Sequence, residues 1–193
     1  MKFVMVGSGA VGSYFGARLM QAGHEVVFVA RGAQLRALRE NGLTLCLGDE
    51  ETVLRPVTAT DEIAAAGAAD FVLIAVKAWQ VAEIAPKLAA LDNGDTRFLT
   101  LQNGVEAPGV VAESVGAAQT VGGLVRGFFE MDAPGRVRHV GVTPAIIFGQ
   151  IDGERTPQME RLHVALTGKR ASTPSCRTIS RRRCGRNSCW SRR

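Results

Sequence analysis

The residues with the clearest chemical purpose form a glycine-rich turn near the N-terminus. The turn follows the apolar run 2–6 and has the spacing G-x-G-x-x-G, in Gly7, Ser8, Gly9, Ala10, Val11 and Gly12. In such turns the glycines allow a tight bend, a close approach of the backbone to a diphosphate and close packing of a helix on a strand. The helix that follows adds free N–H groups and partial positive charge. These six residues are predicted to hold a dinucleotide; a turn that binds nothing is the alternative.

A basic residue ends the second apolar run, Glu25–Ala30. An acidic residue at this place would bind the ribose 2′-hydroxyl of NAD. The chain has Ala30-Arg31-Gly32 instead, without a carboxylate at that point. A guanidinium can pair with a 2′-phosphate through two hydrogen bonds. Arg31 therefore favours NADP(H) as the cofactor, and a solvated surface charge is the alternative interpretation.

Two further polar residues follow apolar runs that are predicted to be strands. Lys77 follows Phe71–Val76, and Asn103 follows Arg97–Leu101. Ligands of open α/β sheets lie outside the carboxyl ends of the strands. There Lys77 can offer an ammonium to a carboxylate or phosphate, and Asn103 both a donor and an acceptor. Both residues are predicted to contact cofactor or substrate. The alternatives are a surface lysine and a plain Asn-Gly turn.

Strand-like and helix-like runs alternate over residues 1–168, which predicts an α/β fold. We expect a Rossmann-type doubly wound sheet, mostly parallel, with helices on both faces. The predicted strands are 2–6, 25–30, 71–76, 97–101, 120–124, 136–140 and 145–148, with an inserted hairpin at 43–47 and 52–54. The predicted helices are 11–22, 33–40, 79–91, 109–115 and 156–166, with a short one capped by Asp61 and running to residue 66.

Composition limits the class of protein. Of the 193 residues, 46% are hydrophobic and 21% charged, as is usual for soluble globular proteins. The longest apolar runs are too short to span a bilayer, and the N-terminus does not resemble a signal peptide. We therefore expect a cytoplasmic protein without a membrane or nucleic-acid partner.

The net charge of +5 comes from the last 25 residues. Residues 169–193 hold nine basic residues and no acidic one, which leaves 14 basic and 18 acidic residues in 1–168. This basic tail also holds three of the four cysteines and has neither helical nor strand periodicity. We expect an irregular segment. A basic arm for nucleic acid or a zinc site is the alternative, but the cysteines lack paired spacing and no histidine lies among them, so no metal site is predicted.

The motifs together resemble the ketopantoate reductase (2-dehydropantoate 2-reductase) family. They are G-S-G-A-V-G, V-A-R-G, V-K-A-W-Q, L-Q-N-G-V-E and A-P-G-R-V-R-H-V-G, and the resemblance covers about residues 1–168. The resemblance implies NADPH-dependent reduction of 2-dehydropantoate, a 2-keto acid, to (R)-pantoate on the path to pantothenate and coenzyme A. It implies that Arg31 contacts the 2′-phosphate and that Lys77 and Asn103 lie at the cofactor–substrate cleft. It also implies a backbone contact near Gly127.

The resemblance stops where the tail begins. It implies a second, all-helical domain that opens with an L-W-x-K segment whose lysine donates the proton, and this sequence contains no such segment. Plausible GC-rich codons for 169–193, read two bases downstream, give A-G-I-D-A-E-L-P-D-D-I-S-T-A-L-W-E-K-F-L-L-V-A. We therefore expect a frameshifted tail without the second domain, which sequencing the coding DNA would test.

Three functions remain open at this stage. They are a reductase of 2-dehydropantoate with impaired turnover, a module that binds NADP(H) without turnover, and a reductase of another 2-keto acid. In the expected truncated chain Lys77 is an auxiliary at most, and no catalytic residue is intact. The face that would pack on the second domain is expected to be apolar and exposed, which predicts self-association.

Overall fold

The computed structural model describes residues 1–151 and 156–167, so the predicted basic tail lies outside the described residues. The described part of the chain forms one mixed sheet of nine strands in the order β4-β3-β9-β8-β7-β6-β1-β2-β5. The strands are β1 Lys2–Val6, β2 Glu25–Val29, β3 Leu43–Leu47, β4 Glu50–Leu54, β5 Thr58–Thr60, β6 Phe71–Ile74, β7 Arg97–Thr100, β8 Thr120–Ala133 and β9 Arg136–Gln150. The α-helices are α1 Ala10–Gln21, α2 Gly32–Asn41, α3 Val81–Ile84, α4 Ala107–Val115 and α5 Pro157–Thr167.

The predicted α/β class and mostly parallel pairing are confirmed. Six strand pairings are parallel, and the two antiparallel ones are β3 with β4 and β8 with β9. The hairpin predicted at 43–54 therefore exists. Its strand β3 pairs with β9, so the hairpin belongs to the same sheet as the central strands.

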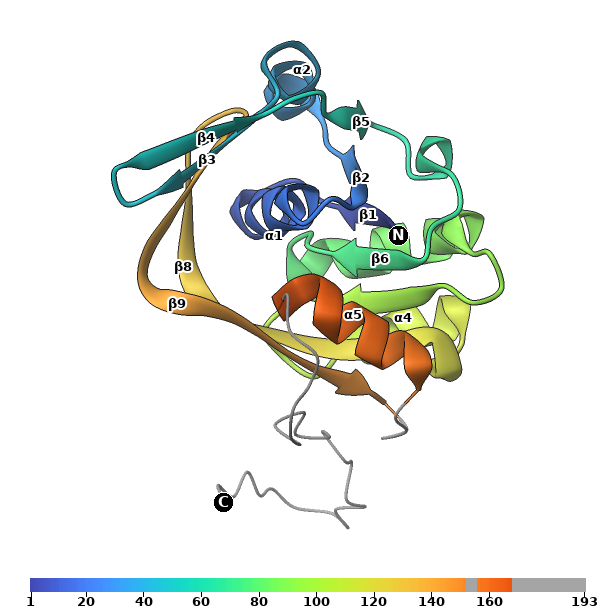
Figure 1. The fold of residues 1–193 in the computed structure, drawn as a ribbon. Helices are drawn as coiled ribbons and strands as arrows, with labels where there is room; N and C mark the ends of the chain where they lie inside the picture. Colours follow the sequence, from blue (N-terminus) through green and yellow to red (C-terminus); the bar gives the residue numbers. More distant parts are fainter. Residues whose placement is uncertain (152–155, 168–193) are drawn as a thin grey trace.

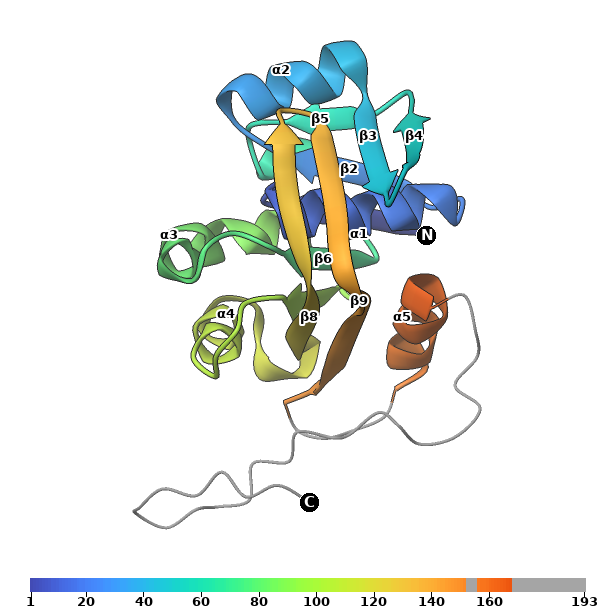
Figure 2. The ribbon, with the colours of Figure 1, turned by 90° about the vertical axis from the view of Figure 1, so that its left-hand side faces the viewer.

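The sheet curls around helix α1, as Figure 1 shows. The long strands β8 and β9 carry the sheet past the end of β7, because β7 pairs only with the first residues of β8. Figure 2 shows these two strands running in front of α1 toward β3. Helix α1 is buried on most sides as a result. Gly16 allows this packing, because a Cβ atom there would overlap the ring of Phe28.

Hydrophobic side chains fill both faces of the sheet, since successive residues of a strand point to opposite faces. Phe3 and Met5 of β1 join the core beneath α1, α2 and α5. Val4 and Val6 join the core on the other face, beneath α3 and α4. Helices on both faces explain why the interior residues of the central strands are apolar on both faces, and they confirm the prediction of a doubly wound sheet.

The strands predicted at 136–140 and 145–148 are one strand. The pairing of β8 with β9 changes register between Arg126 and Phe128, so residues 141–144 form an irregular stretch opposite Gly127. Gly127 and Gly141 both have positive φ, +147° and +78°. Such a bulge bends a strand without ending it, and it tolerates Pro144, which has no N–H to donate. Strand β8 is accordingly much longer than the predicted 120–124.

Two helix predictions were also wrong. The predicted helix 79–91 is a 3₁₀ turn at Ala78–Gln80, helix α3 and a 3₁₀ segment at Ala85–Leu91. Pro86 explains the break after α3, because it has no N–H to donate to the hydrogen bonds of an α-helix. Asp61 caps no helix: the short 3₁₀ helix is Ala64–Ala66, and no side chain caps it.

Several large apolar side chains are exposed on the outer side of β8 and β9. They are Leu124, Phe128, Val140, Val142 and Ile147, and Phe128 is 67% exposed. None of the helices within residues 1–151 and 156–167 is long and apolar enough to cross a membrane.

Candidate dinucleotide site

The four predicted contact points lie at one edge of the sheet, because the strands that carry them end in register. Val6, the last residue of β1, pairs with Val29 of β2 and with Ile74 of β6. Ile74 in turn pairs with Thr100, the last residue of β7. Gly7, Arg31, Lys77 and Asn103 follow these four strand ends by one to three residues, so parallel pairing alone gathers them at this edge.

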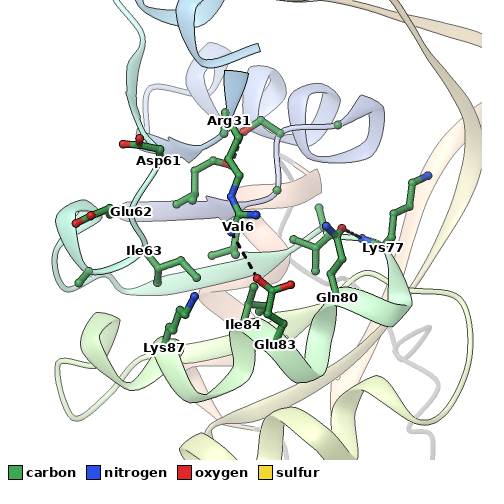
Figure 3. Close-up of a pocket in the computed structure, with 18 of the residues that line it drawn as sticks. Val6, Arg31, Asp61, Glu62, Ile63, Lys77, Gln80, Glu83, Ile84 and Lys87 are labelled. Atoms are coloured by element: carbon green, nitrogen blue, oxygen red, sulfur yellow. Dashed lines mark hydrogen bonds and ion pairs between the residues drawn. The ribbon is translucent and has the colours of Figure 1, made fainter. Parts of the chain in front are cut away.

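A pocket of about 740 Å³ opens at this edge (Figure 3). This volume is typical of sites for small molecules and cofactors. The predicted residues that line it are Gly7, Ser8, Gly9, Arg31 and Lys77. The other predicted residues also belong to the described part of the chain but do not line this pocket: Ala10, Val11, Gly12 and Asn103. The structure thus brings together five of the nine.

The glycine turn has three different local environments. Gly7 has φ +98°, and a Cβ atom there would lie 2.7 Å from the backbone N of Val76. A Cβ atom on Gly12 would overlap the carbonyl oxygen of Gly7. A Cβ atom on Gly9 would meet nothing within 4 Å, although Gly9 lines the pocket. Gly7 and Gly12 therefore serve the packing of the turn, whereas the space beside Gly9 is open to a ligand.

Two serines hold the turn in place. The Ser8 hydroxyl donates to the carbonyl of Val29 at 3.2 Å, and the Ser13 hydroxyl donates to the carbonyl of Ser8 at 3.0 Å. Gln34 of α2 donates to the Ser13 hydroxyl at 3.2 Å and accepts from the N–H of Gly135 at 2.8 Å. These bonds connect the turn to α2 and to the loop between β8 and β9.

The N-termini of α1 and α2 both lie at the pocket. Gly9 and Arg31 are their N-caps, no side chain caps either helix, and neither has an acidic residue in its first turn. Acidic residues are favoured in the first turn of a helix, because they complement the free N–H groups. Their absence here leaves two positive helix ends available to anionic groups of a ligand.

Arg31 extends over the pocket toward Glu83 of α3 (Figure 3). The guanidinium and the carboxylate form an ion pair at 3.8 Å, and both side chains are more than half exposed. Asp61 and Glu62 also line the pocket. The end of β2 carries no carboxylate, as the sequence shows, but the fold brings acidic residues to Arg31's pocket from other segments.

Lys77 is exposed, and two glutamines hold its backbone and the segment that precedes it. Its N–H donates to the side-chain oxygen of Gln80 at 3.1 Å. The buried side-chain amide of Gln102 donates to the carbonyls of Ile74 and Val76, at 3.0 and 2.8 Å. Gln102 therefore ties the loop after β7, which carries Asn103, to the loop after β6. Asn103 itself is exposed on that loop.

The sequence-based prediction omitted the residues Gln34, Gln80, Gln102 and Glu83. Gln80 and Gln102 lie within the K-A-W-Q and Q-N-G motifs. Their position as polar residues shortly after a strand could have identified them from the sequence. Gln34 and Glu83 lie in helices, where no pattern distinguished them from other surface residues. Gly127, where a backbone contact was expected, lies in the bulge of β8 and has the positive φ described above.

Comparisons with known proteins agree with this architecture. The model of the family described as ketopantoate reductase PanE/ApbA matches residues 3–153. A 2-dehydropantoate 2-reductase of Mesorhizobium japonicum is 32% identical over a match that covers 84% of this chain and 56% of the relative. The crystal structure of 2-dehydropantoate 2-reductase from Geobacter metallireducens GS-15 is similar with a TM-score of 0.80 and 29% identity, over 86% of this chain and 55% of that one.

A D-mandelate dehydrogenase solved with NADH and anilino(oxo)acetate has a TM-score of 0.77 at 23% identity, over 86% of this chain and 54% of that one, which is a likeness of fold alone. The chain spans about half the length of the relatives it matches. The family model covers well over half of the chain, and its match includes the glycine turn, Arg31, Lys77 and Asn103. This chain therefore belongs to the ketopantoate reductase PanE/ApbA family.

Proposed function

We propose that this chain binds NADPH for the reduction of 2-dehydropantoate to (R)-pantoate. The observation that carries the proposal is the open space beside Gly9, at a helix N-terminus, in a pocket whose rim holds Arg31. Membership of the family supports the reaction, and the printed activity of the relatives supports the substrate.

The residues present fit a phosphorylated dinucleotide. The diphosphate would lie over Gly9, where the backbone N–H groups of the first turn of α1 are free. The 2′-phosphate would lie at Arg31 and the N-terminus of α2, since a guanidinium binds phosphate through two parallel hydrogen bonds. Buried Ile63 and Ile84 line the same pocket and offer apolar contact to a base. The bound cofactor would supply the hydride.

The residues of the chain would bind and orient the reactants. Negative charge builds on the ketone oxygen as hydride arrives, and a cation or proton donor stabilises it. Lys77 lies on the pocket rim, where its ammonium can attract the carboxylate of a 2-keto acid or assist at that oxygen. Asn103 lies on the exposed loop after β7, and from there its amide would contact the cofactor or the substrate. The resemblance places the proton donor in an L-W-x-K segment, which this sequence lacks.

A module that binds NADP(H) without turnover is the second candidate. The position of Asn103 supports this candidate, because Asn103 does not line the pocket that Gly9 and Arg31 line. A reductase of another 2-keto acid is the third candidate. We retain residues 1–168 as one NADP-binding domain, a 2-keto acid as the small-molecule partner and the cytoplasm as the location.

Two measurements on the purified chain separate these functions. Fluorescence titration with NADPH and NADH measures binding, and absorbance at 340 nm measures NADPH oxidation with 2-dehydropantoate and with other branched 2-keto acids. Binding of NADPH with oxidation by 2-dehydropantoate supports the reductase. Binding without oxidation selects the module. Failure to bind either nucleotide, or a preference for NADH, refutes the cofactor assignment.

A further inference from the structure

The ion pair between Arg31 and Glu83 lies across the site that we assign to the 2′-phosphate. Arg31 follows β2 and is the N-cap of α2, whereas Glu83 belongs to α3, which follows β6. Both line the pocket, and Figure 3 shows the two side chains pointing toward one another. Their charged atoms, Nη2 and Oε1, are 3.8 Å apart, and the side chains are 67% and 57% exposed.

The guanidinium of Arg31 cannot pair fully with Glu83 and with a 2′-phosphate at the same time. A phosphate monoester carries about 1.5 to 2 negative charges at pH 7 and three acceptor oxygens, so it is the stronger partner for Arg31. Glu83 would then lie beside a phosphate of the same sign. NADH has no phosphate at this point, and Arg31 can stay paired with Glu83 when NADH binds.

We propose that Glu83 is a specificity-determining residue, which lowers the affinity for NADPH relative to NADH by competing with the 2′-phosphate for Arg31. The inference rests on the proposed function. It differs from the role of Arg31 itself, because it assigns an opposing role to a residue from another segment of the fold. An exposed ion pair shifts an equilibrium by no more than about fivefold, and repulsion of the phosphate adds to this.

Glu62 provides a matched control. It lines the same pocket and is exposed, but within residues 1–151 and 156–167 no ion pair joins it to Arg31. Glu62→Gln removes the same charge from the same pocket as Glu83→Gln does. A general electrostatic effect would therefore act in both variants, whereas competition for Arg31 acts only in Glu83→Gln.

The experiment measures Kd for NADPH and for NADH with the wild-type chain, Glu83→Gln, Glu62→Gln, Arg31→Ala and the double variant Arg31→Ala/Glu83→Gln. We expect Glu83→Gln to bind NADPH about three- to tenfold more tightly, with the Kd for NADH within twofold of wild type. Glu62→Gln should change the Kd for NADPH less than twofold. In the Arg31→Ala background only repulsion of the phosphate remains, so Glu83→Gln should give less than a twofold gain. Circular dichroism checks that each exposed substitution leaves the fold intact.

The outcomes separate the inference from the proposed function. A wild-type chain that binds neither nucleotide, or an Arg31→Ala variant that binds NADPH as wild type does, refutes the cofactor assignment and with it the inference. If NADPH binds through Arg31 but Glu83→Gln leaves its Kd unchanged, only the inference fails. A gain of the same size without Arg31, or an equal gain in Glu62→Gln, also overturns it, because repulsion alone would then explain the effect.

Discussion

Gly9 and Gly12 lie three residues apart in one turn, yet alanine is expected to act in opposite ways at the two positions. A Cβ atom on Gly9 meets no protein atom within 4 Å, and it enters the space that we assign to the diphosphate. A Cβ atom on Gly12 overlaps the Gly7 carbonyl oxygen and lies 3.2 Å from the Cβ atom of Ala75. Gly9→Ala should therefore impair binding, and Gly12→Ala should impair folding.

The magnitudes follow from these environments. At Gly9, φ is −72° and ψ is −167°, which alanine can adopt. Alanine restricts the unfolded chain, which stabilises the fold by about 0.4–1 kcal/mol. It is a poorer N-cap than glycine, by roughly the same amount. The net change in the free energy of unfolding should be within about 1 kcal/mol of zero. At Gly12 the overlap involves backbone, so overpacking should cost about 3 kcal/mol.

The expected loss of affinity in Gly9→Ala comes from the diphosphate. Displacing one charged group from one or two backbone N–H donors loses about 1.5–3 kcal/mol, which is roughly a 10- to 100-fold increase in the Kd for NADPH. Gly109→Ala is the control. Gly109 is exposed in α4 with nothing within 4 Å of an added Cβ, so alanine should stabilise the helix by about 0.5–1 kcal/mol and leave the Kd unchanged.

Urea unfolding and NADPH titration of the three variants test this reasoning. The expected pattern is normal stability with weak binding for Gly9→Ala, lowered stability for Gly12→Ala, and raised stability with normal binding for Gly109→Ala. If Gly9→Ala binds NADPH as tightly as wild type, the diphosphate does not lie over Gly9. If Gly12→Ala is as stable as wild type, the turn is not packed as described.

Three further predictions concern other parts of the chain. Gln102→Leu should lower the free energy of unfolding by about 1–3 kcal/mol and weaken NADPH binding. The control Gln150→Leu removes a buried amide remote from the pocket and should lower stability alone. An equal loss of binding in both variants would contradict a positioning role for Gln102. Burial raises the pKa of the Tyr14 hydroxyl above its ordinary value of 10.0, so its contribution to stability is complete below pH 10 and is lost as pH rises through the pKa of the folded state. Because the chain has one tyrosine, a titration followed by absorbance at 295 nm reports this group alone. Its midpoint should lie above 10.0 and fall on unfolding in urea, and an unchanged midpoint would refute this prediction. Self-association through the apolar outer side of β8 and β9 predicts that Phe128→Ser raises the monomer fraction in light scattering more than the control Val53→Ser on β4 does. A wild-type chain that is already a monodisperse monomer would refute self-association through this surface.

Much of the fold could be predicted because the central strands carry strong local signals. The interiors of strands β1, β2, β6 and β7 are apolar, and a glycine or a polar residue follows each strand within three positions. The curl of the sheet could not be predicted in this way. It depends on the register of β8 with β9, where Gly127 faces an irregular stretch, and on the pairing of β3 with β9. These contacts join residues far apart in the sequence, and no short window contains them.

The site shows the same division between local and distant information. Parallel register brings Gly7, Arg31 and Lys77 to one edge, so strand ends sufficed to place them. Glu83 pairs with Arg31 from α3, in the segment that follows β6. A sequence pattern treats Glu83 as one of several surface acids. The ion pair of Arg31 and Glu83 joins two segments far apart in the sequence, which come together only in the folded structure.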